Sequence, residues 1–340
     1  MSGLFRSIAH RPADGGRTLP DEGRLAPFDR ATGWIGSAPL TPEALRGRVV
    51  LVDFWTYTCV NWLRTLPYLR AWNAKYADAG LTIVGVHTPE FGFEHDVANV
   101  TAHARALGVE YPVALDADYG VWDDFANRYW PALYLADAAG RIRYHHFGEG
   151  EYAMTEMVIQ QLLADAGAPD TGPDLVAVEP RGLEVAADWS TLRSPESYLG
   201  YGQSSGFVSE DADLYDRAHV YAGHERLRLN EWDLTGDWTV SRHAAVVNEG
   251  GGRISFAFQA RDVNLVVAPS ASGSAIPVRV TLDGRPPGRA HGTDVDDDGR
   301  GVIDSPGTYQ LIRQPDAVAE RVVGIEFPEA GAAAYCMTFG

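Results

Sequence analysis

Cys59 is the residue of this 340-residue chain whose type and setting point most clearly to chemistry. It stands in the stretch VDFWTYTCVNWLRTLP, where an apolar run ends at Trp55 and a helix-like pattern follows Cys59. A cysteine at the start of a helix lies near unpaired backbone N–H groups and the positive end of the helix dipole, and both favour the thiolate. Because the thiolate is the nucleophilic form, the sequence predicts a reactive Cys59 whose sulfur is reached from a cleft.

The chain has one other cysteine and no Cys-x-x-Cys motif. In a dithiol oxidoreductase the second cysteine of that motif releases the mixed disulfide formed by the first, but the residue in that position here is Trp62. We expect Trp62 to pack in the core or the cleft wall; a lid over an oxidised sulfur is the alternative. Cys336 lies in an apolar terminal segment and is expected to be buried, with its Cα atom beyond the ~7 Å from that of Cys59 that a disulfide allows.

Three interpretations of Cys59 remain open on these residues. In a one-cysteine peroxidase the thiolate attacks a peroxide and the resulting sulfenic acid is reduced by an external thiol; Thr56, three residues earlier, gives a spacing similar to the Thr-x-x-Cys of peroxiredoxins. In a monothiol exchange protein Cys59 forms mixed disulfides with small thiols or proteins. In a catalytically degenerate protein Cys59 is a small buried residue and the fold is a scaffold. None of the three requires a cofactor.

Acidic and imidazole side chains supply further candidates. Asp294, Asp296 and Asp298 imitate the first half of a calcium loop, but a serine stands where the loop needs a glutamate. Calcium binding there is therefore a minor alternative to a solvated acidic loop. His87 and Glu90 follow the end of an apolar run, which is the edge of the sheet where ligand sites form in α/β proteins, and we expect a structural role for His87.

The elements that position Cys59 follow from alternating apolar runs and helix-like segments. The runs VVLVDFW and LTIVGVH are typical of strands buried on both faces. The predicted strands are 49–55, 81–87, 132–137 and 141–148, and the predicted helices are 59–76, 95–107, 119–125 and 152–166. This order predicts an α/β fold.

A change in composition divides the chain after these elements. Residues 168–182 are rich in proline and glycine, as is typical of a linker. Beyond them, short alternating segments separated by Gly, Pro and Asp predict an all-β sandwich, jelly-roll-like in form. We therefore predict an irregular arm over 1–40, an α/β domain over 41–167, the linker, and a β-sandwich over 183–340.

Charge and hydropathy restrict the partners. The chain carries 28 basic and 46 acidic residues, a net charge of −18, which disfavours nucleic acid and anionic membranes. No apolar run approaches the ~18 residues of a membrane-spanning helix, and the first twenty residues lack the apolar centre of a signal peptide. The sequence predicts a cytoplasmic protein with neither a membrane nor a nucleic acid as partner.

The region around Cys59 resembles the thioredoxin superfamily. Val52-Asp53-Phe54-Trp55, followed after three residues by Cys59, is similar to the family's first core strand and active cysteine. Pro67 matches the proline of the active-site helix, and Pro131, before a predicted strand, matches the family's cis-proline. The resemblance implies a thioredoxin-like fold with a cis bond at Pro131 beside Cys59 and a buried carboxylate at Asp53. It also implies an external thiol reductant and a disulfide or peroxide substrate as partners.

One cation is a candidate for a role in this site. Arg128 stands three residues before Pro131, and a guanidinium there is placed to stabilise a thiolate.

Longer phrases narrow the resemblance to TlpA-type redoxins, especially the soluble C-terminal part of DipZ-type proteins. These phrases are GVHTPEFGFEHD, YWPALYLAD, HHFGEGEY and SPESYLGY. In that group a β-domain similar to carbohydrate-binding modules follows the redoxin, which implies a carbohydrate or a protein as its partner. The candidates for a sugar-stacking platform are Trp189, Tyr198, Tyr201, Trp232 and Trp238.

Overall fold

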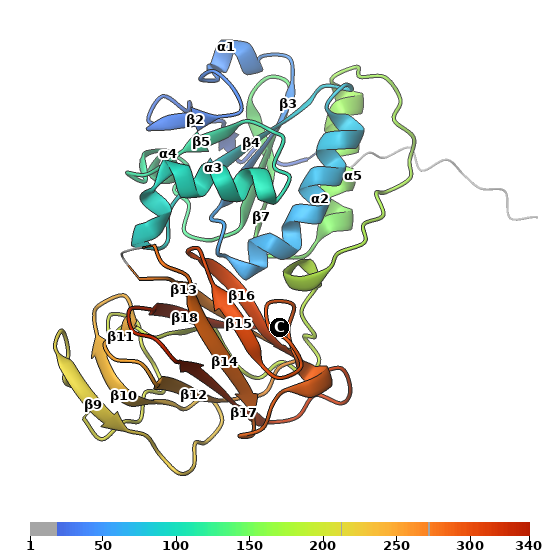
Figure 1. Ribbon diagram of the computed structural model, residues 1–340. Helices are drawn as coiled ribbons and strands as arrows, with labels where there is room; N and C mark the ends of the chain where they lie inside the picture. Colours follow the sequence, from blue (N-terminus) through green and yellow to red (C-terminus); the bar gives the residue numbers. More distant parts are fainter. Residues whose placement is uncertain (1–18, 212, 271–272) are drawn as a thin grey trace, which may run out of the picture.

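The computed structural model describes residues 19–211, 213–270 and 273–340. An α/β part comes first along the chain, and a part built from β-strands follows it and lies against it (Figure 1). This order confirms the fold class expected from the sequence, an α/β fold followed by an all-β sandwich.

The α/β part is built on a seven-stranded sheet in the order β1-β7-β6-β3-β4-β5-β2. At its centre β3 (Val49–Trp55) runs parallel to β4 (Leu81–His87) and antiparallel to β6 (Ala132–Ala136). The short strand β5 (Val113–Leu115) continues the sheet on one side and β7 (Arg141–Phe147) on the other. Every residue of β3 is buried, as expected of a strand that is covered on both faces.

Helices cover both faces of this sheet. On one face α2 (Val60–Tyr76), α3 (Val97–Ala106) and α5 (Tyr152–Asp165) share a core with alternate residues of β3. On the other face α1 (Pro42–Leu45) and α4 (Gly120–Asp124) pack against the remaining residues of β3. The division follows from the strand itself, because successive side chains point to opposite faces.

The two edge strands of the sheet come from the segment 1–40, which was predicted to be an irregular arm. Strand β1 (Gly23–Arg24) pairs with β7, and β2 (Gly33–Ile35) pairs with β5, both antiparallel. Strands of two and three residues are too short to show alternation, so sequence patterning missed them. The first eighteen residues of the predicted arm lie outside the described residues.

The β part forms one eleven-stranded sheet whose main path runs β15-β14-β17-β12-β10-β11-β18-β13-β16, with β8 paired to β18 and β9 to β10. Strands far apart on this path, such as β14 and β16, contribute to one hydrophobic core, so the sheet curls over its own interior. The strands are β8 (Ser197–Tyr198), β9 (Ala218–Ala222), β10 (Trp232–Val240), β11 (Ala245–Val247), β12 (Gly252–Phe258), β13 (Asp262–Ala268), β14 (Ile276–Leu282), β15 (Arg300–Ile303), β16 (Gly307–Arg313), β17 (Arg321–Phe327) and β18 (Ala333–Phe339).

The connection between the two parts follows the surface of the α/β part. The backbone N–H of Val176 donates to both carboxylate oxygens of Glu156 on α5, at 3.0 Å each. Arg70 on α2 forms an ion pair of 2.7 Å with Glu184, which belongs to a short 3₁₀ helix. These contacts hold the connection in place. The predicted domain boundaries remain predictions that limited proteolysis would check.

Candidate active site

Cys59 lies where β3 passes into α2 and is the N-cap residue of that helix. Its backbone N–H donates to the carbonyl of Thr56 (3.3 Å), and its carbonyl accepts the N–H of Leu63 (3.0 Å). The backbone N–H groups of Asn61 and Trp62, in the first helical turn, interact with the sulfur and favour its thiolate. The structure therefore places Cys59 at the helix start, as the sequence predicted.

The loop before β6 also has the conformation that the resemblance implied. The Trp130–Pro131 peptide bond is cis, which confirms that expectation. The side chain of Trp130 packs against the hydrophobic core that includes Cys59. Its indole N–H donates to the carbonyl of Thr88 (3.1 Å), so the loop before β6 is joined to the loop after β4.

The surroundings of Cys59 differ from the prediction of an accessible, acidic thiol. Only 9% of the residue is exposed. Burial raises the pKa of its thiol well above the ordinary value, and the negative charges of Glu90 and Glu196 raise it further. The helix N–H groups act in the opposite direction and are outweighed. The prediction was wrong because distant segments cover the helix start, and the local sequence around Cys59 cannot reveal them.

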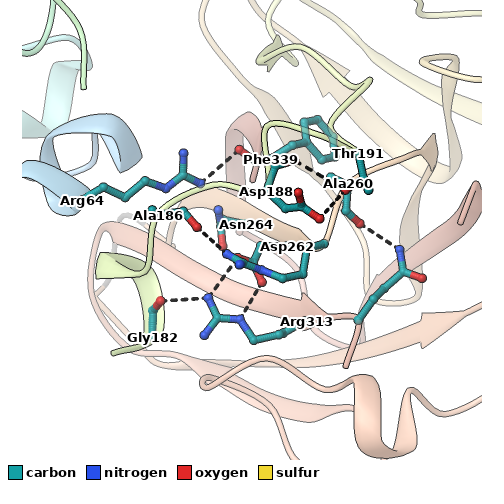
Figure 2. A network of polar contacts seen from close by, with 12 residues as sticks. Arg64, Gly182, Ala186, Asp188, Thr191, Ala260, Asp262, Asn264, Arg313 and Phe339 are labelled. Atoms are coloured by element: carbon teal, nitrogen blue, oxygen red, sulfur yellow. Dashed lines mark hydrogen bonds and ion pairs between the residues drawn. The ribbon is translucent and has the colours of Figure 1, made fainter. Parts of the chain in front are cut away.

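Strands of the β part provide this cover. Thr308 in β16 donates a hydrogen bond of 2.8 Å to the carbonyl of Thr58, the residue before Cys59. Arg64 on α2 reaches across from the α/β part and donates to the carbonyl of Phe339 at the end of β18 (3.2 Å; Figure 2). The start of α2 is therefore part of an interface between the two parts.

A cluster of ionisable side chains occupies the same interface. The Tyr198 hydroxyl in β8 donates to the carboxylate of Glu90, on the loop after β4, and lies 3.4 Å from the carboxylate of exposed Glu196. Burial, together with the charge of Glu196, raises the pKa of Glu90 to about 8. Cys336 in β18 is fully buried, and the pKa of its thiol is raised by burial and by the charges of Glu196, Glu90 and Cys59. Both cysteines therefore belong to one electrostatic cluster.

Sequence reasoning found only part of this cluster. Glu90 was a candidate because it follows the carboxyl end of a central strand. Tyr198 was considered for a different role. Cys336 was expected to be buried, which the structure confirms, and its separation from Cys59 beyond the reach of a disulfide stays a prediction. No local signal joins these residues, because the cluster depends on how the β part is placed against the α/β part.

Trp62 lies in the core, with none of its surface exposed. Its ring stacks on that of Trp55 with centroids 4.2 Å apart, and its indole N–H donates to Oδ2 of Asp53 (3.0 Å). The hydroxyl of Tyr111 donates to the same oxygen (3.4 Å). Burial raises the pKa of Asp53 to about 7. These contacts agree with core packing for Trp62 and leave no exposed ring to serve as a lid.

The remaining predicted site residues differ in their placement. Thr56 is fully buried close to Cys59 in the chain. His87 ends β4, and burial lowers its pKa to about 3, so the ring is neutral as expected of a structural histidine. Arg128 is exposed on the loop after α4, and the side-chain charges that chiefly act on the Cys59 thiol are those of Glu90 and Glu196. The expected support of a thiolate by Arg128 stays a prediction.

The acidic residues considered for calcium binding form hydrogen bonds or ion pairs with other groups of the protein. Asp294 accepts the backbone N–H of Gln310 (2.6 Å), and Asp296 accepts that of Arg300 (2.7 Å). Asp298 forms an ion pair of 2.6 Å with Arg300. Within the described parts of the chain, no group of three or more His, Cys, Asp or Glu side chains is placed to hold a metal ion. The calcium alternative is therefore not supported.

The aromatic side chains considered for sugar stacking do not share a surface. Trp232 and Trp238 are fully buried in the core of the β part, whereas Trp189 is 64% exposed. Tyr198 belongs to the interface cluster. The platform was wrong because alternation along β10 turns both of its tryptophans inward.

Two family models match the chain. Residues 36–162 match the family described as Redoxin, and residues 194–340 match the one described as Thioredoxin like C-terminal domain. The α/β part is a thioredoxin-like redoxin domain. Cys59, the helix that follows it and cis-Pro131 all lie within this redoxin domain.

Known relatives match different shares of the chain. Protein DipZ of Mycobacterium tuberculosis is 36% identical over 286 residues, which are 81% of this chain and 38% of DipZ. The chain therefore spans well under half the length of that relative. Thiol-disulfide oxidoreductase YkuV of Bacillus subtilis is 26% identical over 142 residues, 41% of this chain and 95% of YkuV. A solved thioredoxin-like protein in its oxidised form is 26% identical, with a TM-score of 0.38, covering 44% of this chain and 99% of its own.

Across the described ranges, no helix combines the length and the apolar character needed to cross a membrane.

Proposed function

We propose that this chain is a thiol-disulfide oxidoreductase in which Cys59 is the attacking nucleophile. The observation that carries the proposal is the position of Cys59 at the first turn of α2, where the N–H groups of Asn61 and Trp62 favour its thiolate. The name of YkuV, which is matched over 95% of its own length, supports the same class of activity.

The proposed reaction begins with attack of the Cys59 thiolate on one sulfur of a disulfide substrate. A new disulfide forms between Cys59 and that sulfur, and the other half of the substrate leaves as a thiol. Because the β part covers Cys59, the substrate reaches the sulfur only when the interface opens. A peroxide is the alternative oxidant, and it would convert Cys59 to a sulfenic acid.

A second candidate function is a scaffold that presents the β part to a binding partner. The observation that favours it is the burial of Cys59 together with the raised pKa of its thiol. A buried cysteine of this kind is ordinarily unreactive. The two candidate functions differ in whether the Cys59 thiol is oxidised and reduced again during a catalytic cycle.

Reduction of a protein disulfide by dithiothreitol, with catalytic amounts of the full chain, separates the candidates. We expect the native protein to accelerate the reduction, Cys59→Ser to abolish that acceleration, and the control Thr101→Ser on α3 to retain it. Consumption of hydrogen peroxide under the same conditions compares the two oxidants. If the native protein accelerates neither reaction, the oxidoreductase proposal is wrong and the scaffold function remains.

A further inference from the structure

Four residues of the β part form a row across neighbouring strands. Thr308 in β16 pairs directly with Val266 in β13, Val266 pairs with Cys336 in β18, and Cys336 pairs with Tyr198 in β8. Directly paired residues carry their side chains on the same face of a sheet. The thiol of Cys336 therefore lies on the face from which Thr308 and Tyr198 project.

The residues at both ends of this row contact the redoxin domain near Cys59. Thr308 donates to the carbonyl of Thr58 (2.8 Å), and the hydroxyl of Tyr198 donates to the carboxylate of Glu90. Because strands lie about 4.8 Å apart, Cys336 stands about 10 Å along the row from the residue that touches Thr58. Its side chain consequently faces the redoxin domain at the start of α2.

The packing around Cys336 agrees with this register. Cys336 and Val266 form a small buried core with Phe91, which follows Glu90 in the redoxin domain. The charges of Glu90 and Glu196 act on the thiols of both Cys59 and Cys336. The negative charge of an ionised Cys59 also acts on Cys336. Both sulfurs are free thiols and share one buried interface.

We propose that Cys336 is the resolving cysteine for Cys59, supplied across the interface by the β part. It takes the role that the second cysteine of a Cys-x-x-Cys motif plays, in a chain where Trp62 holds that position. The inference rests on the proposed thiol–disulfide exchange at Cys59. It replaces the expectations that exchange here uses one cysteine alone and that Cys336 lies too far from Cys59 to form a disulfide with it.

The two steps balance in atoms and electrons. In the first, the Cys59 thiolate attacks a disulfide R–S–S–R′, a Cys59–S–S–R bond forms, and R′S⁻ leaves and takes up a proton. In the second, the Cys336 thiolate attacks the Cys59 sulfur, a Cys59–Cys336 disulfide forms, and RS⁻ leaves and takes up a proton. The protein thiols lose two electrons and the substrate disulfide gains them. An external dithiol then reduces the interdomain disulfide and restores both thiols.

The carboxylates of the cluster suit these proton movements. Each thiol must lose its proton before it attacks, and Glu90, with a pKa of about 8, exchanges protons near neutral pH. The Glu196 carboxylate lies 3.4 Å from the Tyr198 hydroxyl and interacts with the Cys336 thiol, and burial raises its pKa. The charges of Glu90 and Glu196 act on both thiols, so these two groups are the proposed acceptors of the thiol protons.

The test treats the reduced full-length protein with one equivalent of 5,5′-dithiobis(2-nitrobenzoate) and follows it by intact mass and peptide mapping. We expect the native protein to release two equivalents of thionitrobenzoate, to carry no adduct, and to give a peptide pair joined through Cys59 and Cys336. In Cys336→Ser we expect one equivalent to be released and a stable adduct to remain on Cys59. Thermal unfolding by circular dichroism checks that the variant is folded. The joined peptide is measured in the native protein, so this result does not depend on the folding of the variant.

The outcomes distinguish this inference from the proposal on which it rests. A stable adduct on Cys59 of the native protein, or adducts on both cysteines without a joined peptide, would overturn the resolving role and leave Cys59 as a single nucleophile. No reaction of Cys59 in either protein would overturn both proposals.

Discussion

At the residue scale, Trp62 changes what the active-site motif does. The residue that would resolve a mixed disulfide in Cys-x-x-Cys is here a core side chain, and Asp53 accepts its indole N–H instead of lying beside a second thiol. The sequence was sufficient to exclude resolution within the motif. It could not show that Asp53 and Trp62 are joined, because this contact depends on the packing of α2 against β3.

Asp53 gives the free energy of unfolding a specific pH dependence. Burial raises its pKa from 3.8 to about 7 in the folded protein. Between these values the folded state binds more protons than the unfolded state, so Asp53 lowers stability as pH rises through this range, by up to about 1.4 kcal/mol per pH unit. We expect Asp53→Asn, which keeps an acceptor for Trp62, to make the decline shallower.

Urea denaturation at several pH values measures this effect, with Asp118→Asn on the loop before α4 as the control. A pH dependence in Asp53→Asn that matches the native protein would show that Asp53 is not held with a raised pKa.

At the element scale, the central strands and long helices were predictable, whereas the edges and the interface were not. The apolar runs of β3 and β4 are unambiguous because both faces of these strands are buried. The short edge strands β1 and β2 carry too few residues to show a pattern. The position of Cys59 at the start of α2 could be predicted, because an apolar strand pattern ends and a helical pattern begins there. The burial of Cys59 could not be predicted from these patterns.

The packing of α2 on β3 predicts a large effect for one ring. Trp62 on α2 stacks on Trp55 of β3 and has no exposed surface. We expect Trp62→Ala to lower the free energy of unfolding by about 3–5 kcal/mol, as is usual when a large buried aromatic is truncated.

The matched control is Trp189→Ala, since Trp189 is 64% exposed and its loss should change stability by less than about 0.5 kcal/mol. Urea denaturation gives both values. Equal effects of the two substitutions would contradict the core position of Trp62.

At the scale of the whole molecule, the β part acts as a cover for the redoxin domain. Arg64 is central to this contact because its buried guanidinium bonds to Glu149 (2.8 Å) in its own domain and to the carbonyl of Phe339 in the β part. Removing a buried partner of this kind leaves the other groups without their hydrogen bonds, which is costly. The interface should therefore open more often when Arg64 is replaced.

We expect Arg64→Gln to increase the rate at which iodoacetamide labels Cys59. The rate should rise about tenfold for each 1.4 kcal/mol by which the substitution reduces the free energy of opening the interface. Peptide mapping of the quenched protein measures the rate at this cysteine. Arg105→Gln, at an exposed position on α3, is the control and should label at the native rate. A rate that does not change in Arg64→Gln would mean that the interface does not control access.

The pH dependence of Cys59 alkylation in the native full chain tests the central claim most directly. The account predicts that iodoacetamide labels Cys59 without unfolding the protein, and that the rate continues to rise above the pH at which an ordinary cysteine levels off, because burial and Glu90 raise the pKa of the thiol. Labelling that appears only in denaturant would contradict the account, since a thiol that never becomes accessible in the folded protein cannot be the nucleophile.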